Sequence, residues 1–106
     1  MAKYLIMGNY VGEGVAGLLK EGGSSRRDAA AKLVESLGGK MESFYYAFGG
    51  SDVFGIMDLP DNSAAASLAL TVNASGAVKI RTVPLMTPEE VDEATKKSPA
   101  YRAPGS

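Results

Sequence analysis

The chain has 106 residues, of which 45% are apolar, and 11 basic and 12 acidic side chains give it a formal net charge of −1. This length fits one small domain, and the balanced charge argues against nucleic-acid binding, whose affinity comes largely from neutralised phosphates. The chain contains neither cysteine nor histidine. This excludes disulfides and thiolate nucleophiles, and it removes the commonest general base and transition-metal ligand.

The N-terminal segment predicts a strand over residues 3–10, KYLIMGNY, because apolar side chains fall on both of its alternating faces. Strands of this kind are usually covered on both faces. The first eight residues, MAKYLIMG, contain an apolar stretch that is too short for a signal peptide or a membrane span. We therefore expect a cytoplasmic protein that does not bind membranes.

A glycine-rich turn follows and contains a literal G-x-G-x-x-G over residues 12–17. The strand before this motif and the helix after it match the dinucleotide-binding fingerprint. Two observations oppose that function: Gly22-Gly23 stops the helix early, and the chain lacks the βαβαβ repeat of a doubly wound sheet. We interpret the motif as a glycine-rich connection and expect no cofactor.

The middle of the chain predicts a helix followed by a hairpin. The S-x-x-D pattern at residues 25–28 is a capping box that starts the helix, and Gly38-Gly39 ends it. Residues 40–48 and 53–59 have the aromatic and apolar content of strands. The turn Gly49-Gly50-Ser51-Asp52 between them is typical of a hairpin.

The next segment repeats the helix–strand order. Residues 60–62, Pro-Asp-Asn, end the third strand and cap an alanine-rich helix, SAAASLALTV, which ends at Gly76. Residues 77–86 predict the fourth strand. Because Pro84 cannot donate a backbone hydrogen bond, this strand is expected at an edge of the sheet.

A last helix is predicted from residues 87–90, where a T-x-x-E capping box has proline at the first helical position, to about residue 97. The order β-α-β-β-α-β with this additional C-terminal helix predicts an α+β fold, a ferredoxin-like antiparallel sheet with both main helices on one face. We assign residues 1–97 to a single domain and residues 98–106 to a tail. Apolar side chains on the other sheet face predict that a second copy of the chain covers it.

Several runs of residues, spread over the whole chain, resemble the GYD-domain family of small bacterial proteins, which is related to the dimeric α/β-barrel group. The runs are KYLIMGNY, EGVAGLLKEGGSSRR, ESLGGKMESFYYAFGGSDV, DLPDN, ALTVNASGAVKIRT and LMTPEEVDEATKKSPAYR. The family is named after a Gly-Tyr-Asp triplet, whose place here is taken by Gly50-Ser51-Asp52. A role for the family's tyrosine therefore does not carry over.

This resemblance implies a protomer of the dimeric α/β-barrel type, whose open sheet face packs in a homodimer or a larger ring. In related barrel families, the cavity between helices and sheet can hold small organic molecules. Some of those relatives are cofactor-free oxygenases or isomerases. Members of the GYD-domain family itself are mostly of unknown function, and the resemblance supplies no catalytic residue.

Asp52 is the candidate catalytic residue, because it can act as a general base where a pocket raises its pKa. The alternative is an aspartate that accepts backbone hydrogen bonds in the turn. Tyrosines from two strands are candidates for an aromatic ligand pocket with hydroxyl groups: Tyr4, Tyr10, Tyr45 and Tyr46. Their alternative role is packing in the core or in a subunit interface.

Arg26 and Arg27 are further ligand-binding candidates at the expected start of the second helix. A helix start with positive side chains favours an anion such as a phosphate or a carboxylate. Two positive side chains in the first turn also interact unfavourably with the positive end of the helix dipole. This arrangement favours an anion as a partner. The alternative is a solvated, charged helix face.

Arg81 is the last ligand-binding candidate and shares one face of the fourth strand with Lys79. In a covered interface these two cations need carboxylate partners, for which Glu42 and Asp58 are candidates. On an exposed edge they would discourage aggregation between sheets. No group of oxygen ligands converges in the sequence, so we expect no metal site.

Three functions remain open at this point. The first is a homo-oligomeric small-molecule-binding or accessory protein that uses the cavity between sheet and helices. The second is a cofactor-free enzyme of the oxygenase or isomerase type, with Asp52 or a tyrosine transferring a proton, and the third is a purely structural assembly partner. The missing histidine slightly favours binding over catalysis. The expected partners are further copies of the chain and a small organic molecule or an anion.

Overall fold

The computed structural model describes all residues from 1 to 106. Its elements are β1 (Ala2–Tyr10), α1 (Glu13–Glu21), α2 (Gly23–Ser36), β2 (Lys40–Tyr46), β3 (Val53–Leu59), α3 (Asn62–Ala74), β4 (Val78–Leu85) and α4 (Pro88–Thr95). None of the helices combines the length and the apolar content that crossing a membrane requires.

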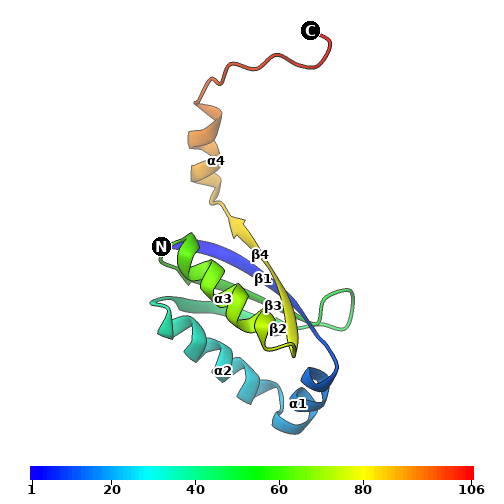
Figure 1. Ribbon diagram of the computed structural model, residues 1–106. Coiled ribbons are helices and arrows are strands. Elements are labelled where there is room, and N and C mark those ends of the chain that lie inside the picture. The colour runs from blue at the N-terminus through cyan, green and yellow to red at the C-terminus, as the bar shows by residue number, and fades with distance from the viewer.

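The four strands form one antiparallel sheet in the order β2-β3-β1-β4. Helices α2 and α3 cover the same face of this sheet, and the short helix α1 links β1 to α2 (Figure 1). This arrangement confirms the predicted α+β, ferredoxin-like fold. The position of β4 at an edge agrees with Pro84, which has no N–H to donate.

Two helix starts follow directly from their sequence motifs. The Asp61 carboxylate accepts a hydrogen bond from the backbone N–H of Ala64 at 2.9 Å and caps α3. At α4, the Thr87 hydroxyl accepts from the Glu90 N–H, and the Glu90 carboxylate accepts from the Thr87 N–H, each at 3.1 Å. The predicted capping box of α4 is therefore confirmed.

The capping box predicted at Ser25 is wrong. Helix α2 begins at Gly23, and no side chain caps it. The reason is Gly22, whose φ of 85° is readily adopted only by glycine. Its N–H closes α1 on the Leu18 carbonyl at 2.8 Å, and its carbonyl accepts from the Arg26 N–H at 3.4 Å, so one residue ends α1 and starts α2.

Gly14, the second glycine of the G-x-G-x-x-G, has a structural explanation. A Cβ on Gly14 would collide with the backbone carbonyl of Ala77, which lies just before β4. The same carbonyl accepts a hydrogen bond from the Val11 N–H at 3.0 Å. This close approach of two backbones requires glycine, and it supports a glycine-rich connection over a dinucleotide loop.

The core lies between the sheet and the two helices that cover it. Leu59 of β3 and Val34 of α2 are its most deeply buried large side chains, at 0% and 1% exposure. The other members of the core cluster are Tyr4, Ile6, Met57, Ala65 and Leu68. The core therefore joins β1 and β3 to both helices.

The opposite sheet face, called the open face below, has an apolar centre with charged ends. The pairing register places these apolar side chains beside one another across β1, β3 and β4: Leu5, Met7, Phe54, Ile56, Val83 and Leu85. At one end, the Lys3 ammonium lies 3.0 Å from both the Glu42 and the Asp58 carboxylates. Lys79 and Arg81 lie at the other end.

The C-terminal segment forms an arm that extends away from the sheet and its covering helices. Every residue from Met86 to Ser106 is exposed, and α4 and the tail extend away from the end of β4 (Figure 1). The radius of gyration is 17.0 Å, whereas a compact chain of this length has about 13 Å. The arm accounts for the difference.

Replacing the most buried core side chain tests this packing. Leu59→Ala is expected to lower the free energy of unfolding by about 3 kcal/mol, because truncating a fully buried leucine leaves a cavity. Urea denaturation measures the change. Leu70→Ala on the outer side of α3, where the side chain is 72% exposed, is the matched control and should change stability by less than about 0.5 kcal/mol. Equal losses in the two variants would contradict this assignment of the core.

Candidate functional site

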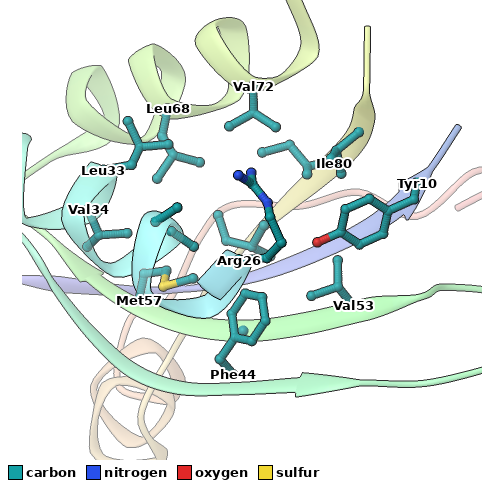
Figure 2. Close-up of a pocket in the computed structure, with 15 residues that line it drawn as sticks. Tyr10, Arg26, Leu33, Val34, Phe44, Val53, Met57, Leu68, Val72 and Ile80 are labelled. Carbon is teal, nitrogen blue, oxygen red and sulfur yellow. The ribbon is translucent and has the colours of Figure 1, made fainter. Parts of the chain in front are cut away.

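An apolar cavity of about 130 Å³ lies between the sheet and the helices α2 and α3 (Figure 2). Thirteen of the fifteen residues that line it are hydrophobic, so a ligand here would meet mainly carbon atoms. The lining residues are Ile6, Tyr10, Arg26, Ala29, Ala30, Leu33, Val34, Phe44, Val53, Gly55, Met57, Leu68, Val72, Val78 and Ile80. The sheet, helix α2 and helix α3 therefore all contribute side chains to the lining of the cavity.

The cavity exists because small residues face larger ones across it. Gly55 lies in the middle of β3 and lines the cavity. The Met57 side chain occupies the space above it, since a Cβ on Gly55 would lie 2.7 Å from the end of Met57. On the opposite side, α2 presents Ala29 and Ala30. These two alanines leave a volume that leucine-sized side chains would occupy.

Only two of the lining residues bring strongly polar groups, Arg26 from the first turn of α2 and Tyr10 from the end of β1. In Figure 2, the Tyr10 hydroxyl points toward the Arg26 side chain. Arg26 is also the single charged residue of the lining. Its guanidinium lies 3.6 Å from the Glu21 carboxylate, and both side chains are partly exposed.

Tyr46 lies beside this polar pair and holds the start of α2. Its hydroxyl donates to the Gly23 carbonyl at 2.9 Å, and its ring packs edge-on against Phe44 with centroids 5.2 Å apart. Burial, followed by the neighbouring Tyr10 hydroxyl, raises the pKa of Tyr46 to about 12. Tyr46 is therefore neutral at physiological pH and acts as a hydrogen-bond donor.

Asp52 lies outside the lining of the cavity. Its carboxylate accepts a hydrogen bond from the Tyr10 backbone N–H at 3.0 Å. Its backbone N–H donates to the Gly8 carbonyl, and its carbonyl accepts from the Ala47 N–H, both at 2.8 Å. Asp52 thus fastens the β2–β3 connection to β1 and fixes the backbone of Tyr10.

The remaining candidate residues lie outside the lining of the cavity, and two of them, Arg27 and Tyr45, line a shallow surface pocket together with Tyr46. The buried Tyr4 donates its hydroxyl hydrogen bond to the Asn62 side chain at 2.6 Å, and Tyr45 is 70% exposed. Arg27 is paired with the adjacent Asp28 at 3.2 Å. Arg81 lies on the open face, with a guanidinium nitrogen 3.4 Å from the Ser51 hydroxyl.

The structure therefore brings together three of the candidates, Tyr10, Arg26 and Tyr46. Sequence reasoning missed the apolar lining of the cavity, above all Phe44 and the residues of α3. The available signal was the pair Ala29-Ala30 on the inner side of α2. The carboxylates proposed as partners for Lys79 and Arg81 pair with Lys3 within one chain.

The sequence matches the family model of the GYD domain over residues 4–95. The chain belongs to the GYD-domain family. No curated protein matches it. Among solved structures, this GYD-domain protein is similar to the NE2512 protein of unknown function from Nitrosomonas europaea, with 20% sequence identity and a TM-score of 0.41. The alignment covers 94% of this chain and 96% of that one.

The raised pKa of Tyr46 predicts a loss of stability in alkali. The unfolded phenol titrates near its ordinary value of 10.0 and the folded one near 12, so the folded state holds this proton more tightly between these values. The resulting stabilisation is complete below about pH 10 and is lost as pH rises toward 12. In Tyr46→Phe, the free energy of unfolding should therefore decrease less steeply with pH over this range than in the wild type. Urea denaturation at successive pH values measures this decrease. Tyr45→Phe, which replaces an exposed tyrosine, should leave the fall unchanged, and identical slopes for wild type and Tyr46→Phe would contradict the prediction.

Proposed function

We propose that this GYD-domain protein binds a small, mainly apolar molecule in the cavity between sheet and helices, and that it does so as a homo-oligomer. The supporting observation is the cavity itself, which has about 130 Å³ and an almost wholly hydrophobic lining. An engineered apolar cavity of roughly 150 Å³ stays dry and binds benzene. The volume here thus suits one six-membered ring or a short carbon chain.

The expected affinity follows from the apolar area that such a ligand buries. At about 0.8 kcal/mol for each buried carbon group, a body of about six carbons gains roughly 5 kcal/mol. This corresponds to a dissociation constant on the order of 0.1–1 mM. A tighter natural ligand would need polar contacts in addition.

The open face supports self-association. Its apolar centre includes Leu5, Phe54 and Ile56, and contiguous apolar patches of this kind mark interaction sites. At one end of the face, Lys3 and Lys40 balance the carboxylates of Glu42 and Asp58. Lys79 and Arg81 lie at the other end. Because a two-fold axis brings the same patch of two copies together, the apolar centre of this face fits a second copy of the chain.

The C-terminal arm supports the same assembly. Helix α4 has eight residues, and an isolated helix of this length is marginal in water. Its Val91 is 47% exposed, and Tyr101 in the tail is exposed as well. Packing of the arm on another copy would bury these side chains and stabilise the helix.

The alternative of a cofactor-free enzyme has less support. The Asp52 carboxylate is engaged with the Tyr10 backbone and does not reach the lining of the cavity. Tyr46 stays protonated at physiological pH, because its pKa is about 12. A purely structural role is also less favoured, since a structural core gains stability from filling such a volume.

Filling the cavity tests the binding function. Fluorobenzene is expected to bind the wild-type protein, as seen by line broadening in ¹⁹F NMR. Ala30→Leu should abolish this binding, because the larger side chain occupies the cavity. Ala66→Leu makes the same change on the exposed side of α3 and should bind as the wild type does. Absence of binding to the wild type, or undiminished binding to a folded Ala30→Leu variant, would refute the proposed site.

A charge in the open face tests the assembly. Sedimentation velocity should show at least two associated chains for the wild type and a single chain for Phe54→Asp, because a carboxylate in an apolar interface is costly to desolvate. Leu70→Asp places the same charge on the outer side of α3, where the leucine is exposed, and should not alter the mass. A monomeric wild-type protein would contradict the proposed assembly.

A further inference from the structure

We infer that the ligand of this cavity is a small carboxylate, whose single negative charge binds the Arg26 guanidinium while its apolar ring or short chain fills the cavity. This inference rests on the proposed function and specifies the chemical class of ligand for the same site. Three features of the structure carry it: the position of Arg26, the lack of a strong partner for it, and the fixed position of Tyr10.

Arg26, in the first turn of α2, lies where its side chain can contact a ligand in the cavity. It is the one charged residue among the fifteen that line the cavity, and Figure 2 shows its side chain over the apolar residues, near Val72 and Ile80. The arginine stem packs on apolar surface while the guanidinium remains available for hydrogen bonds. A ligand in this volume would therefore have one cation among the groups around it.

The present partner of Arg26 is weak. The Glu21 carboxylate lies 3.6 Å from the guanidinium, whereas strong charge-assisted hydrogen bonds span about 2.7–2.9 Å. Both side chains are substantially exposed, and exposed pairs of this kind contribute little stability. A ligand carboxylate can therefore replace Glu21, or share the guanidinium with it, at little cost.

The first turn of α2 has no negative charge of its own. No side chain caps this helix, and its first turn contains no acidic residue. Arg27 is paired with Asp28 at 3.2 Å, whereas Arg26 has only the longer contact of 3.6 Å to Glu21. An anion at this position would offset the unfavourable combination of a positive side chain and the positive end of the helix dipole.

Tyr10 supplies the second polar contact for the ligand. It also explains why Asp52 matters to the site, since Asp52 binds the Tyr10 backbone. The Tyr10 hydroxyl points toward Arg26 within the cavity (Figure 2), and the Asp52 carboxylate fixes the Tyr10 backbone through its N–H at 3.0 Å. A carboxylate has two oxygens, so it can accept from the guanidinium and from the phenol at once. Asp52 is thus a positioning residue for the ligand site.

The volume of the cavity and the charge of Arg26 together narrow the chemical class of the ligand. A volume of about 130 Å³ accommodates one aromatic ring or about six carbons, which excludes long-chain fatty acids and fused ring systems in this conformation. An ammonium group would be repelled by Arg26, and a neutral group would gain no ion pair. Benzoate has the charge and the dimensions that the site requires.

Three ligands of similar size test the inference: benzoate, benzamide and benzylammonium. Each is titrated at low salt and neutral pH, and binding is followed by chemical-shift changes of the protein. The wild type is expected to bind benzoate at least about tenfold more tightly than benzamide. The free energy of one charge-assisted hydrogen bond corresponds to roughly a tenfold change in the dissociation constant. Benzylammonium should bind most weakly. Arg26→Gln should remove the preference for benzoate by weakening benzoate binding far more than benzamide binding, whereas the control Arg27→Gln should keep the preference.

The outcomes separate this inference from the function on which it rests. Equal affinity of the wild type for benzoate and benzamide, or equal losses in Arg26→Gln and Arg27→Gln, would overturn the carboxylate class while the binding function stands. Benzoate binding that persists in a folded Ala30→Leu variant would place the anion on the surface and overturn the inference as well. If none of the three ligands binds and fluorobenzene also fails, the cavity is not a binding site and both proposals fall.

Discussion

The central strands β1 and β3 carry apolar side chains on both faces, and the chain has helices for only one of them. Most features of the molecule depend on this constraint. On the helical side, α2 and α3 bury Leu59 and Val34 and create the core. On the other side, apolar residues such as Phe54 and Ile56 remain without a cover in the single chain. Apolar area that stays in water forgoes about 25 cal/mol per Å², and recovering it would drive the proposed self-association.

The covered side is itself incompletely filled. A space of about 130 Å³ between sheet and helices remains unfilled, and side chains that border such a space lose packing contacts. Small residues such as Ala30 border it, and natural proteins commonly give up stability where a site needs the space. Packing thus favours a binding role for the cavity.

The fold was predictable from the sequence because its signals are local. Asp61 and the Thr87–Glu90 box fix two helix starts, and the hairpin turn and Pro84 fix the order of the strands. The start of α2 was not predictable from its capping motif, because Gly22 closes one helix and opens the next through its backbone. The backbone conformation of Gly22 thus overrides a side-chain motif that begins three residues later, at Ser25.

The candidate site was predictable only in part. Alternation along β2 already separates Tyr45 from Tyr46, since neighbouring residues of a strand point to opposite faces, and the structure places Tyr45 among the exposed residues. Arg26 was identifiable as a cation at a helix start. Its position above a cavity depends on how α2 packs against β3 and α3, and no local pattern contains that information.

The site and the open face lie on opposite sides of one sheet, and this separation has a functional consequence. All residues that line the cavity, including Arg26 and Tyr10, come from a single chain. A second copy on the open face would therefore contribute no group to the ligand. Its effect on binding would pass through the central strands, because Gly55 lines the cavity while its neighbours Phe54 and Ile56 point to the open face. Assembly would hold the sheet in place beneath the cavity. Burial of the open face would then offset the packing contacts that are missing around the cavity on the helical side of the sheet.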